Sequence, residues 1–319
     1  MSRYSIEPLD LSGLRTVSLH ARGGKVHTGQ FAKPYEHGAG LLGLLDAMPR
    51  ILAADSLRRL AEAILIARQK GRAIVWGLGG HVIKCGLAPV LNDLAKRGFA
   101  TAFALNGAAS IHDFEIALAG HTSEDVEAVL PDGSFGSAEE TGHGMNTAIA
   151  AGDRDELGMG EALGRALEEL GAEQNAQNSL LWQSYRARIP VTVHVAVGTD
   201  TPHIHPAVNP AALGNATHRD FRLLCSLLKG LNDGGVYINV GSAVVLPEVF
   251  LKAISALRNL GCPMAQFTTA NLDFLQHYRP KMNVVERPHA HSGGEGISIT
   301  GHHEILVPLL AALLIECAP

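Results

Sequence analysis

Apolar residues along the chain follow two alternating patterns, one with helical spacing and one made of short continuous runs. Residues 56–71 (SLRRLAEAILIARQKG) have apolar side chains at helical spacing, a serine that can cap the helix and a glycine that can end it. The run AIVW at 73–76 then indicates a short buried strand, and VTVHVAV at 191–197 is the clearest strand signal in the chain. The further predicted strands are 101–105, 236–240, 265–269 and 296–300, and the further predicted helices are 82–97, 111–129, 218–230, 247–260 and 303–315.

This alternation predicts an α/β fold with a doubly wound, mostly parallel sheet and helices on both faces. Residues 1–48 are rich in Gly, His and Pro and show little periodicity, so we expect an irregular N-terminal arm. Residues 49–319 are predicted to form a single nucleotide-binding-like α/β domain. The Gly-rich, acidic stretch 130–160 interrupts the alternation and indicates a surface insertion or flap, which is either a functional lid or plain decoration.

Composition narrows the class of protein. With 319 residues, 46% of them apolar, the chain can bury a large core, and a net charge of −5 without a long basic run argues against nucleic-acid binding. Four widely spaced cysteines indicate buried thiols in a reducing compartment. The first residues lack a signal-peptide pattern, and the longest apolar stretch, 305–315, is too short to span a bilayer. We therefore expect a cytoplasmic protein that binds small molecules, with no nucleic-acid or membrane partner.

Most candidate functional residues follow the predicted strands. In an open parallel sheet, ligands bind beyond the carboxyl ends of the strands, where glycines allow backbone N–H groups to approach a phosphate. The loops in question are 77–81, 106–113, 198–206, 241–243, 270–274 and 301–304. The candidate cofactor-binding residues in or beside them are Gly79, Gly80, His81, Asn106, Gly107, Asp113, Gly241, Ser242, Thr269, Asn271, Asp273 and His302.

Each motif within these loops, taken alone, is weaker evidence for nucleotide binding than the whole set of loops. GLGGHV at 77–82 fails the dinucleotide fingerprint because Val82 stands where the third glycine belongs, so a tight strand-to-helix turn explains it equally well. Asp113 can either satisfy backbone amides at a helix start or bind ribose or substrate hydroxyls. His194 lies in mid-strand, where a core or interface role is expected.

The loop GTDTPHIHP at 198–206 carries the candidate catalytic residues Asp200, His203 and His205. These side chains can serve in acid–base chemistry or bind substrate. The alternative is a divalent metal ion held by the same three residues, with a further ligand from 289–291 or 302–303, although no spaced zinc motif is present.

Taken in order, the loops resemble deoxyhypusine synthase. Thr199 and Asp200 fall on the T-D positions of that family's substrate loop, and the spacing from Gly86 to Asp113 matches without a gap. The resemblance spans roughly residues 70–315, with a break around 130–180. It implies a Rossmann-like sheet, an NAD cofactor and a homodimer or homotetramer. The segments that carry it are GGHVIKCG (79–86), NGAASIHD (106–113), IPVTVHVAVGTDTPHIHP (189–206), FTTANLDFLQHYRP (267–280) and HHEILVPLL (302–310).

Departures from that family argue against its reaction. The family's reactive lysine corresponds to the stretch VVERPHAH at 284–291, which has no lysine to form an imine. His205 and His112 occupy positions where the family has carboxylates for a polycation, which favours a neutral or anionic substrate or a metal.

The sequence thus predicts a deoxyhypusine synthase-like enzyme that binds NAD or another nucleotide and acts on a small substrate other than spermidine, as a transferase or an oxidoreductase. The alternatives are a metal-dependent hydrolase or lyase that uses the 198–206 loop, and a nucleotide-binding protein without catalytic activity.

Overall fold

A six-stranded, entirely parallel sheet organises the chain in the computed structural model, which describes residues 3–171 and 173–318. The strand order is β3-β2-β1-β4-β5-β6, so the winding direction reverses between β1 and β4. This confirms the predicted doubly wound α/β fold. The strands are β1 (Ile74–Leu78), β2 (Ala102–Asn106), β3 (Val191–His194), β4 (Val236–Val240), β5 (Phe267–Asp273) and β6 (Gly294–Thr300).

Helices surround the sheet. The longer ones are α1 (Gly40–Ala47), α2 (Leu52–Gln69), α4 (Ala88–Lys96), α5 (Gly107–Ala119), α7 (Glu139–Arg154), α8 (Met159–Glu169), α10 (Leu180–Ala187), α11 (Pro210–Leu228), α12 (Val245–Asn259) and α14 (His303–Cys317). The shorter ones are α3 (Gly80–Lys84), α6 (Val126–Val129), α9 (Glu173–Ala176), α13 (Tyr278–Pro280), a π-helix (Lys281–Glu286) and 3₁₀ turns at Thr28–Gln30, Leu130–Asp132, Thr201–Ile204, Lys229–Leu231 and Arg287–His289.

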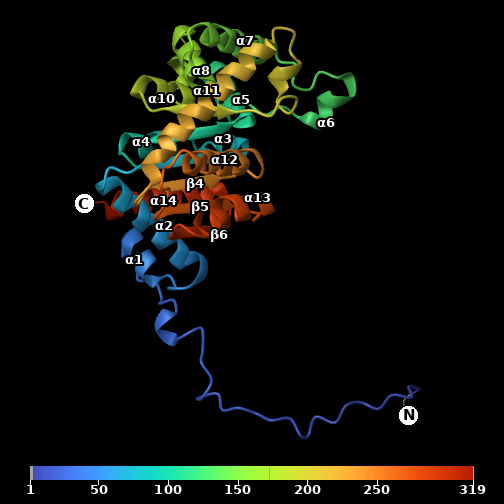
Figure 1. The fold of residues 1–319 in the computed structure, drawn as a ribbon, viewed down its shortest axis with the longest axis vertical. Helices are drawn as coiled ribbons and strands as arrows, with labels where there is room; N and C mark the ends of the chain where they lie inside the picture. Colours follow the sequence, from blue (N-terminus) through green and yellow to red (C-terminus); the bar gives the residue numbers. More distant parts are fainter. Residues whose placement is uncertain (1–2, 172, 319) are drawn as a thin grey trace.

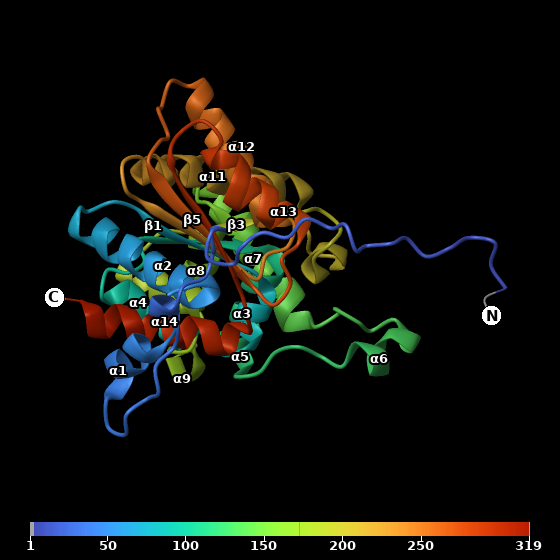
Figure 2. The ribbon, with the colours of Figure 1, turned by 90° about the horizontal axis from the view of Figure 1, so that it is seen from below.

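Both faces of the central strands β1 and β4 are buried, which explains why these strands are almost continuously apolar, whereas the edge strand β6 has exposed residues on one face. Trp76 and Leu78 point to the face covered by α2, α4 and α14, whereas Val75 and Tyr237 point to the face covered by the end of α11, by α12 and by the π-helix. Figure 2 shows the two helical layers on opposite sides of the strands. Successive strand residues therefore pack into two separate cores.

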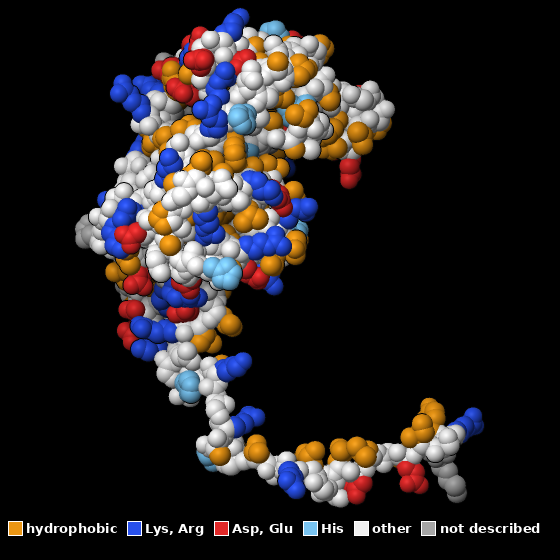
Figure 3. Space-filling view, in the orientation of Figure 1, with side chains coloured by type: hydrophobic (Ala, Val, Ile, Leu, Met, Phe, Trp, Pro, Cys, Tyr) orange, Lys and Arg blue, Asp and Glu red, His pale blue; other side chains and the backbone are white. Residues whose placement is uncertain are grey.

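The predicted N-terminal arm, 1–48, is extended over most of its described length and projects away from the body (Figure 1). Most of its described side chains are exposed, among them the apolar Leu9 and Val17. Figure 3 shows hydrophobic side chains along this extended part. The last part differs from the prediction, because Gly40–Ala47 forms α1, buries Leu45 and packs against α14. The apolar pair Leu44–Leu45 follows Leu41 at helical spacing, a short signal within an otherwise irregular stretch.

The predicted flap at 130–160 is largely helical. Residues around α6 project from the body (Figures 1 and 2), but α7 occupies 139–154 and packs against α8 and α11. Met145 and Ile149 are buried there. The segment thus supplies part of the core as well as a projecting loop.

Other predicted elements shift or divide. The helix expected over 82–97 is two helices, α3 and α4, separated at Gly86, whose φ of +73° interrupts the helix. The helices expected near 111–129 are α5, which begins earlier and ends at Gly120 with left-handed backbone geometry, and the short α6. None of the helices in the described residues combines the length and apolar character needed to cross a bilayer.

Asp220 on α11 is hydrogen-bonded to the edge strand β3 and to the start of α8. The side chain is fully buried, and Oδ2 accepts hydrogen bonds from the backbone N–H groups of Gly160 (2.9 Å) and Val193 (2.7 Å). Burial raises the pKa of this carboxyl to about 7. The side chain thus connects three elements in a region of low solvent access.

We expect Asp220→Ala to lower the free energy of unfolding by about 2–4 kcal/mol, since two buried N–H donors lose their acceptor. Urea denaturation at pH 6, followed by circular dichroism, measures this loss. Asp125→Ala is the matched control, because Asp125 is exposed and caps only the short helix α6; its expected cost is about 1 kcal/mol or less. Equal losses in the two variants would contradict the assigned role of Asp220.

Candidate functional site

The carboxyl edge of the sheet gathers the loops that follow all six strands. The loops after β1 and β4 meet backbone to backbone, because a Cβ atom on Gly79 would lie 2.1 Å from the carbonyl oxygen of Gly241. Gly241 has a φ of +66°, and a Cβ there would lie 2.7 Å from the His303 ring. Glycine is therefore required at both positions for the two loops and His303 to pack together.

A chain of side-chain amides crosses the same edge. Asn239 donates from Nδ2 to Oδ1 of Asn271 (2.7 Å), and Asn271 donates to Oε1 of Gln276 (2.8 Å). Asn239 also donates to the Ser242 carbonyl, which fixes the loop after β4. Ser242 lies in the loop after β4, as the sequence predicted, whereas Asn271 lies within β5 and not in the loop predicted at 270–274. Both side chains are hydrogen-bonded within the fold. Asn239 was not among the predicted residues, although a lone asparagine in the apolar strand VYINV is a visible signal.

Asp273, His302 and His303 lie at the outer part of this edge. His303 is wholly buried, and neither ring nitrogen makes a hydrogen bond of normal geometry with a described residue. Its Nε2 lies 3.6 Å from Oδ1 of Asp273, and burial lowers the pKa of the imidazole. The His302 side chain is exposed and stacks on Phe274. The sequence predicted His302 as the cofactor-binding residue, but the buried histidine of the pair is His303.

Two predicted cofactor residues lie away from this group. The Asp113 carboxylate accepts hydrogen bonds from Ser179 Oγ (2.5 Å) and from the backbone N–H groups of Leu180 and Leu181 (2.6 and 2.8 Å) at the start of α10. Thr269 lies in the middle of β5, where its hydroxyl donates to the Val284 carbonyl. The sequence allowed Asp113 to accept hydrogen bonds from amides at the start of a helix, and it does so. The helix is α10, 66 to 68 residues further along the chain, and not the helix that carries Asp113.

Three further residues lie at the edge in structural roles. The Asn106 side chain caps α5 by accepting from the Ala109 N–H group at 2.9 Å. Gly80 packs against α5, since a Cβ there would lie 2.9 Å from Ala108 Cβ. His194 is buried at the end of β3, where burial lowers the pKa of its imidazole to about 3, in agreement with the core role expected for it.

Of the three predicted catalytic residues, Asp200 and His203 lie near each other, whereas His205 is turned toward α7. Nδ1 of His203 accepts a hydrogen bond from the Gly198 N–H group, and Nδ1 of His205 accepts one from the Ala207 N–H group, both at 3.1 Å. In the neutral form both rings thus carry their proton on Nε2. His205 Nε2 lies 3.1 Å from Oε2 of Glu139 on α7.

The metal alternative for this loop lacks the required geometry. His203 Nε2 and Asp200 Oδ2 are 4.0 Å apart, while His205 is turned toward α7. Within residues 3–171 and 173–318, these three side chains do not form a group whose ligand atoms could surround one ion. The loop is instead fixed to α7, where Asn146 donates to the Pro202 carbonyl at 2.8 Å.

Asp200 is the most unusual acid of the edge. Its Oδ2 atom is buried without a hydrogen-bond partner in the described chain, and burial raises the pKa of the carboxyl to about 6. The carboxylate lies directly on Gly107, where an added Cβ would come within 2.0 Å of Oδ2. A carboxyl group held in this way can exchange a proton near neutral pH.

Asp200 lines a cavity of about 860 Å³. Its walls come from α5, from residues 121–126 and 135–141, and from residues 199–201, with Lys84 at one side. The projecting segment around α6 and the N-terminal end of α7 therefore help to enclose it.

His112 lines the same cavity and is oriented by a hydrogen-bonded chain. Its Nδ1 lies 2.7 Å from Oγ1 of Thr122, and that hydroxyl donates to Glu115. Thr141 donates to the other Glu115 oxygen at 3.1 Å. Since the Thr122 proton goes to Glu115, the hydroxyl accepts the proton on His112 Nδ1, which leaves Nε2 with a free lone pair in the neutral ring. Glu115, Thr122 and Thr141 were missed from the sequence, because 26 residues separate Glu115 from Thr141 and no motif connects them.

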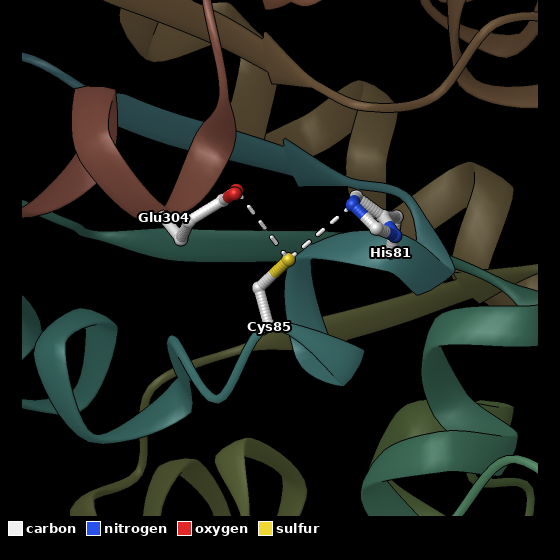
Figure 4. A group of neighbouring side chains, drawn as sticks. All are labelled: His81, Cys85 and Glu304. Carbon is white, nitrogen blue, oxygen red and sulfur yellow. Dashed lines mark hydrogen bonds between the residues drawn. The ribbon is translucent and has the colours of Figure 1, made fainter.

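A second cluster lies beside α3. His81 and Cys85, one helical turn apart, face Glu304 at the start of α14 (Figure 4). Cys85 Sγ lies 3.3 Å from Nε2 of His81 and 3.8 Å from Oε2 of Glu304. Burial, followed by the Glu304 carboxylate, raises the pKa of the Cys85 thiol. These are the His, Cys and carboxylate side chains of the described residues that come close enough together to hold a metal ion.

Comparisons with known proteins support the fold. No family model and no curated protein matches the sequence. A Methanococcus maripaludis S2 protein described as a LOR/SDH protein aligns with 83% of this chain and 70% of its own, with a TM-score of 0.52 and 16% identity. A protein of Entamoeba histolytica described as a deoxyhypusine synthase aligns over 90% of this chain and 97% of its own, with a TM-score of 0.52 and 10% identity.

A third similar structure is AgrE in a ternary complex with ornithine and NAD⁺. It has a TM-score of 0.50 and 15% identity, and the alignment covers 82% of this chain and 32% of AgrE. The chain thus spans about a third of that protein. At these identities the likeness establishes a related Rossmann-like fold, including that of a deoxyhypusine synthase, and leaves the activity to the site itself.

We expect Gly107→Ala to displace the Asp200 carboxylate and to lower the free energy of unfolding by about 1–3 kcal/mol, because the new methyl group has no space. Gly214→Ala on the exposed face of α11 is the matched control; no atom lies within 4 Å of its Cβ position, and we expect it to stabilise the protein by about 0.5–1 kcal/mol. Thermal unfolding distinguishes the two. An unchanged unfolding temperature in Gly107→Ala would contradict the close contact between Gly107 and the Asp200 carboxylate.

Proposed function

We propose that the chain is an enzyme that binds NAD or a related nucleotide and acts on a small molecule in the cavity beside α5. The observation that carries this proposal is Asp200, whose buried Oδ2 atom has no hydrogen-bond partner in the described chain and whose side chain lines a cavity that also holds the oriented imidazole of His112. Unpartnered buried acids reduce stability and are retained mainly where they act on a ligand.

The nucleotide part of the proposal rests on topology. In doubly wound sheets, ligands occupy the edge where the strand order reverses, which here lies between β1 and β4. The loops at that edge are 79–81 and 241–243, and their glycines allow the two backbones to pack against each other where the strand order reverses. AgrE, which has a related fold, was crystallised with ornithine and NAD⁺. We therefore place the nucleotide beside these two loops.

The two titratable groups of the cavity have complementary roles in proton transfer. Asp200, whose carboxyl has a pKa of about 6, can retain a proton into the neutral range and serve as an acid. Nε2 of neutral His112 has a free lone pair and can serve as a base. NAD, when bound, supplies a hydride acceptor, so this pair suits removal of a proton from a hydroxyl or amino group.

Spermidine transfer to a protein lysine is excluded from the proposal. The stretch 284–291, which corresponds to the reactive lysine of deoxyhypusine synthase, has no lysine and forms the end of the π-helix and a 3₁₀ turn. Without that amine, the imine of the deoxyhypusine reaction has no nucleophile at this position.

Calorimetric titration of NAD into protein freed of carried-over ligand tests the nucleotide part. We expect saturable binding of one NAD per chain and a loss of about tenfold or more in affinity for Ala243→Asp, because the added carboxylate would repel a phosphate at the loop after β4. Leu260→Asp is the matched control. It adds the same charge beyond α12, at the opposite edge of the sheet, where Leu260 is 77% exposed.

Absence of NAD binding in the folded, ligand-free protein would contradict the nucleotide part. Equal weakening by Ala243→Asp and Leu260→Asp would place the ligand elsewhere.

Asp200→Asn tests whether the buried acid is held at a cost to stability. The folded-state pKa of about 6 lies above the ordinary value of 3.8, so the folded protein holds this proton more tightly than the unfolded chain and loses stability as the pH rises from 3.8 to about 6. Asparagine stays neutral, and we expect the variant to exceed the wild type by about 1–2 kcal/mol at pH 8 and by little at pH 4.5. Urea denaturation at both pH values provides the measurement.

Asp113→Asn is the contrasting control. Its carboxyl pKa is also raised to about 6, but its oxygens accept three hydrogen bonds, so an amide loses acceptors and destabilises the protein. If Asp200→Asn behaved in the same way, Asp200 would be a structural residue and the catalytic assignment would fail.

A further inference from the structure

The cluster His81, Cys85 and Glu304 combines an imidazole, a thiol and a carboxylate from two elements. His81 and Cys85 lie on and just after α3, and Glu304 lies in the first turn of α14. Figure 4 shows the three side chains pointing toward one another. Their ligand atoms all lie within 4.8 Å of one another.

We propose that these three side chains form a binding site for a divalent cation of the zinc type. Zinc–sulfur bonds of about 2.3 Å and zinc–nitrogen bonds of about 2.0–2.1 Å at tetrahedral angles place sulfur and nitrogen about 3.5 Å apart. The observed distances from Cys85 Sγ, 3.3 Å to His81 Nε2 and 3.8 Å to Glu304 Oε2, fit this spacing with small side-chain movements.

Donor chemistry selects the cation. A thiolate and an imidazole favour Zn²⁺ and related transition metals, whereas Mg²⁺ and Ca²⁺ require mainly oxygen ligands. When the ion binds, a sulfur–metal bond replaces the S–H bond of Cys85, and the proton leaves to solvent. No oxidant or further reactant is involved.

The His81 ring is held in place by neighbouring rings. Phe274 meets it edge to face, with centroids 5.9 Å apart, and His303 lies at 5.6 Å. His303 is wholly buried, and its ring nitrogens have no hydrogen-bond partner of normal geometry in the described chain. A buried imidazole that lies 3.6 Å from the Asp273 carboxylate, with no hydrogen bond of normal geometry, is a second sign that this part of the edge receives a polar ligand.

Three protein ligands leave one tetrahedral position for water or substrate. His81 and Glu304 are exposed and Cys85 is partly exposed, so this position opens to solvent. Closed structural sites usually have four protein ligands, whereas three ligands and an open position are typical of sites that act on water or substrate. The site contains no residue of the 198–206 loop. It shares His81 with the loop 79–81, but its test uses metal alone and does not require NAD to bind.

Cobalt(II) is a suitable probe, because a thiolate ligand gives it an absorption band in the near ultraviolet that nitrogen and oxygen ligands do not. The full chain, prepared without a histidine tag and stripped with a chelator, is titrated with Co²⁺. We expect one ion per chain with a thiolate band that Zn²⁺ removes by competition. His81→Gln and Glu304→Gln should each weaken binding by about tenfold or more.

Cys85→Ser should abolish the thiolate band, and Cys262→Ser is the matched control. Cys262 is likewise partly exposed but follows α12 at the opposite edge of the sheet, so its replacement should leave the band unchanged. A folded wild-type protein without a thiolate band would overturn the proposal, as would a band that survives Cys85→Ser.

Alkylation of the wild-type protein tests the same site without substitutions. We expect Zn²⁺ to slow the reaction of iodoacetamide with Cys85 at least about tenfold and to leave Cys225 and Cys262 unchanged, as measured by peptide mass spectrometry. Equal rates at Cys85 with and without Zn²⁺ would count against the site, including in the case where Cys85→Ser does not fold.

Discussion

Burial of the parallel sheet on both faces is the constraint on which the rest of this structure depends. Strands such as β1 and β4 have no solvent-facing side, so nearly all their side chains are apolar. In β4 the polar Asn239 is one residue from the carboxyl end, and in a parallel sheet all the carboxyl ends lie at one edge. The amides of Asn239 and Asn271, the carboxyl of Asp200 and the buried ring of His303 all lie at or near that edge for this reason.

Close backbone contact, permitted by glycine, determines how the edge is arranged. Gly79 lies against Gly241, and Gly107 lies against the Asp200 carboxylate. Gly142 on α7 lies against the His205 ring, since a Cβ there would come within 2.5 Å of it. Helix α7 therefore fixes the loop that carries Asp200, and the segment between β2 and β3 shapes the cavity as much as the sheet does.

The sequence predicted the sheet well because buried strands and amphipathic helices are local patterns. Helix α7 escaped prediction because Gly142, Gly144 and Gly152 lower its intrinsic helix propensity. In the structure these glycines allow close contacts with His205, Phe114 and Ala162, which compensate through packing. The chain from His112 through Thr122 to Glu115 and the role of Asp113 were equally hidden, because each depends on a partner that only the tertiary fold brings near.

Helix α3 connects the two chemically distinct parts of the edge. A Cβ on Gly80 would lie 2.9 Å from Ala108 and 3.3 Å from His112, in the wall of the cavity, whereas the next residue, His81, faces Cys85 and Glu304. Gly80 thus contacts the wall of the cavity that holds His112, and the next residue, His81, belongs to the cluster with Cys85 and Glu304. Gly80 packs its backbone directly against α5, with no flexible side chain between them. A shift of α3 that moves His81 is therefore expected to move the part of α5 that carries His112. Ligand binding at one part of the edge is therefore expected to change the geometry of the other.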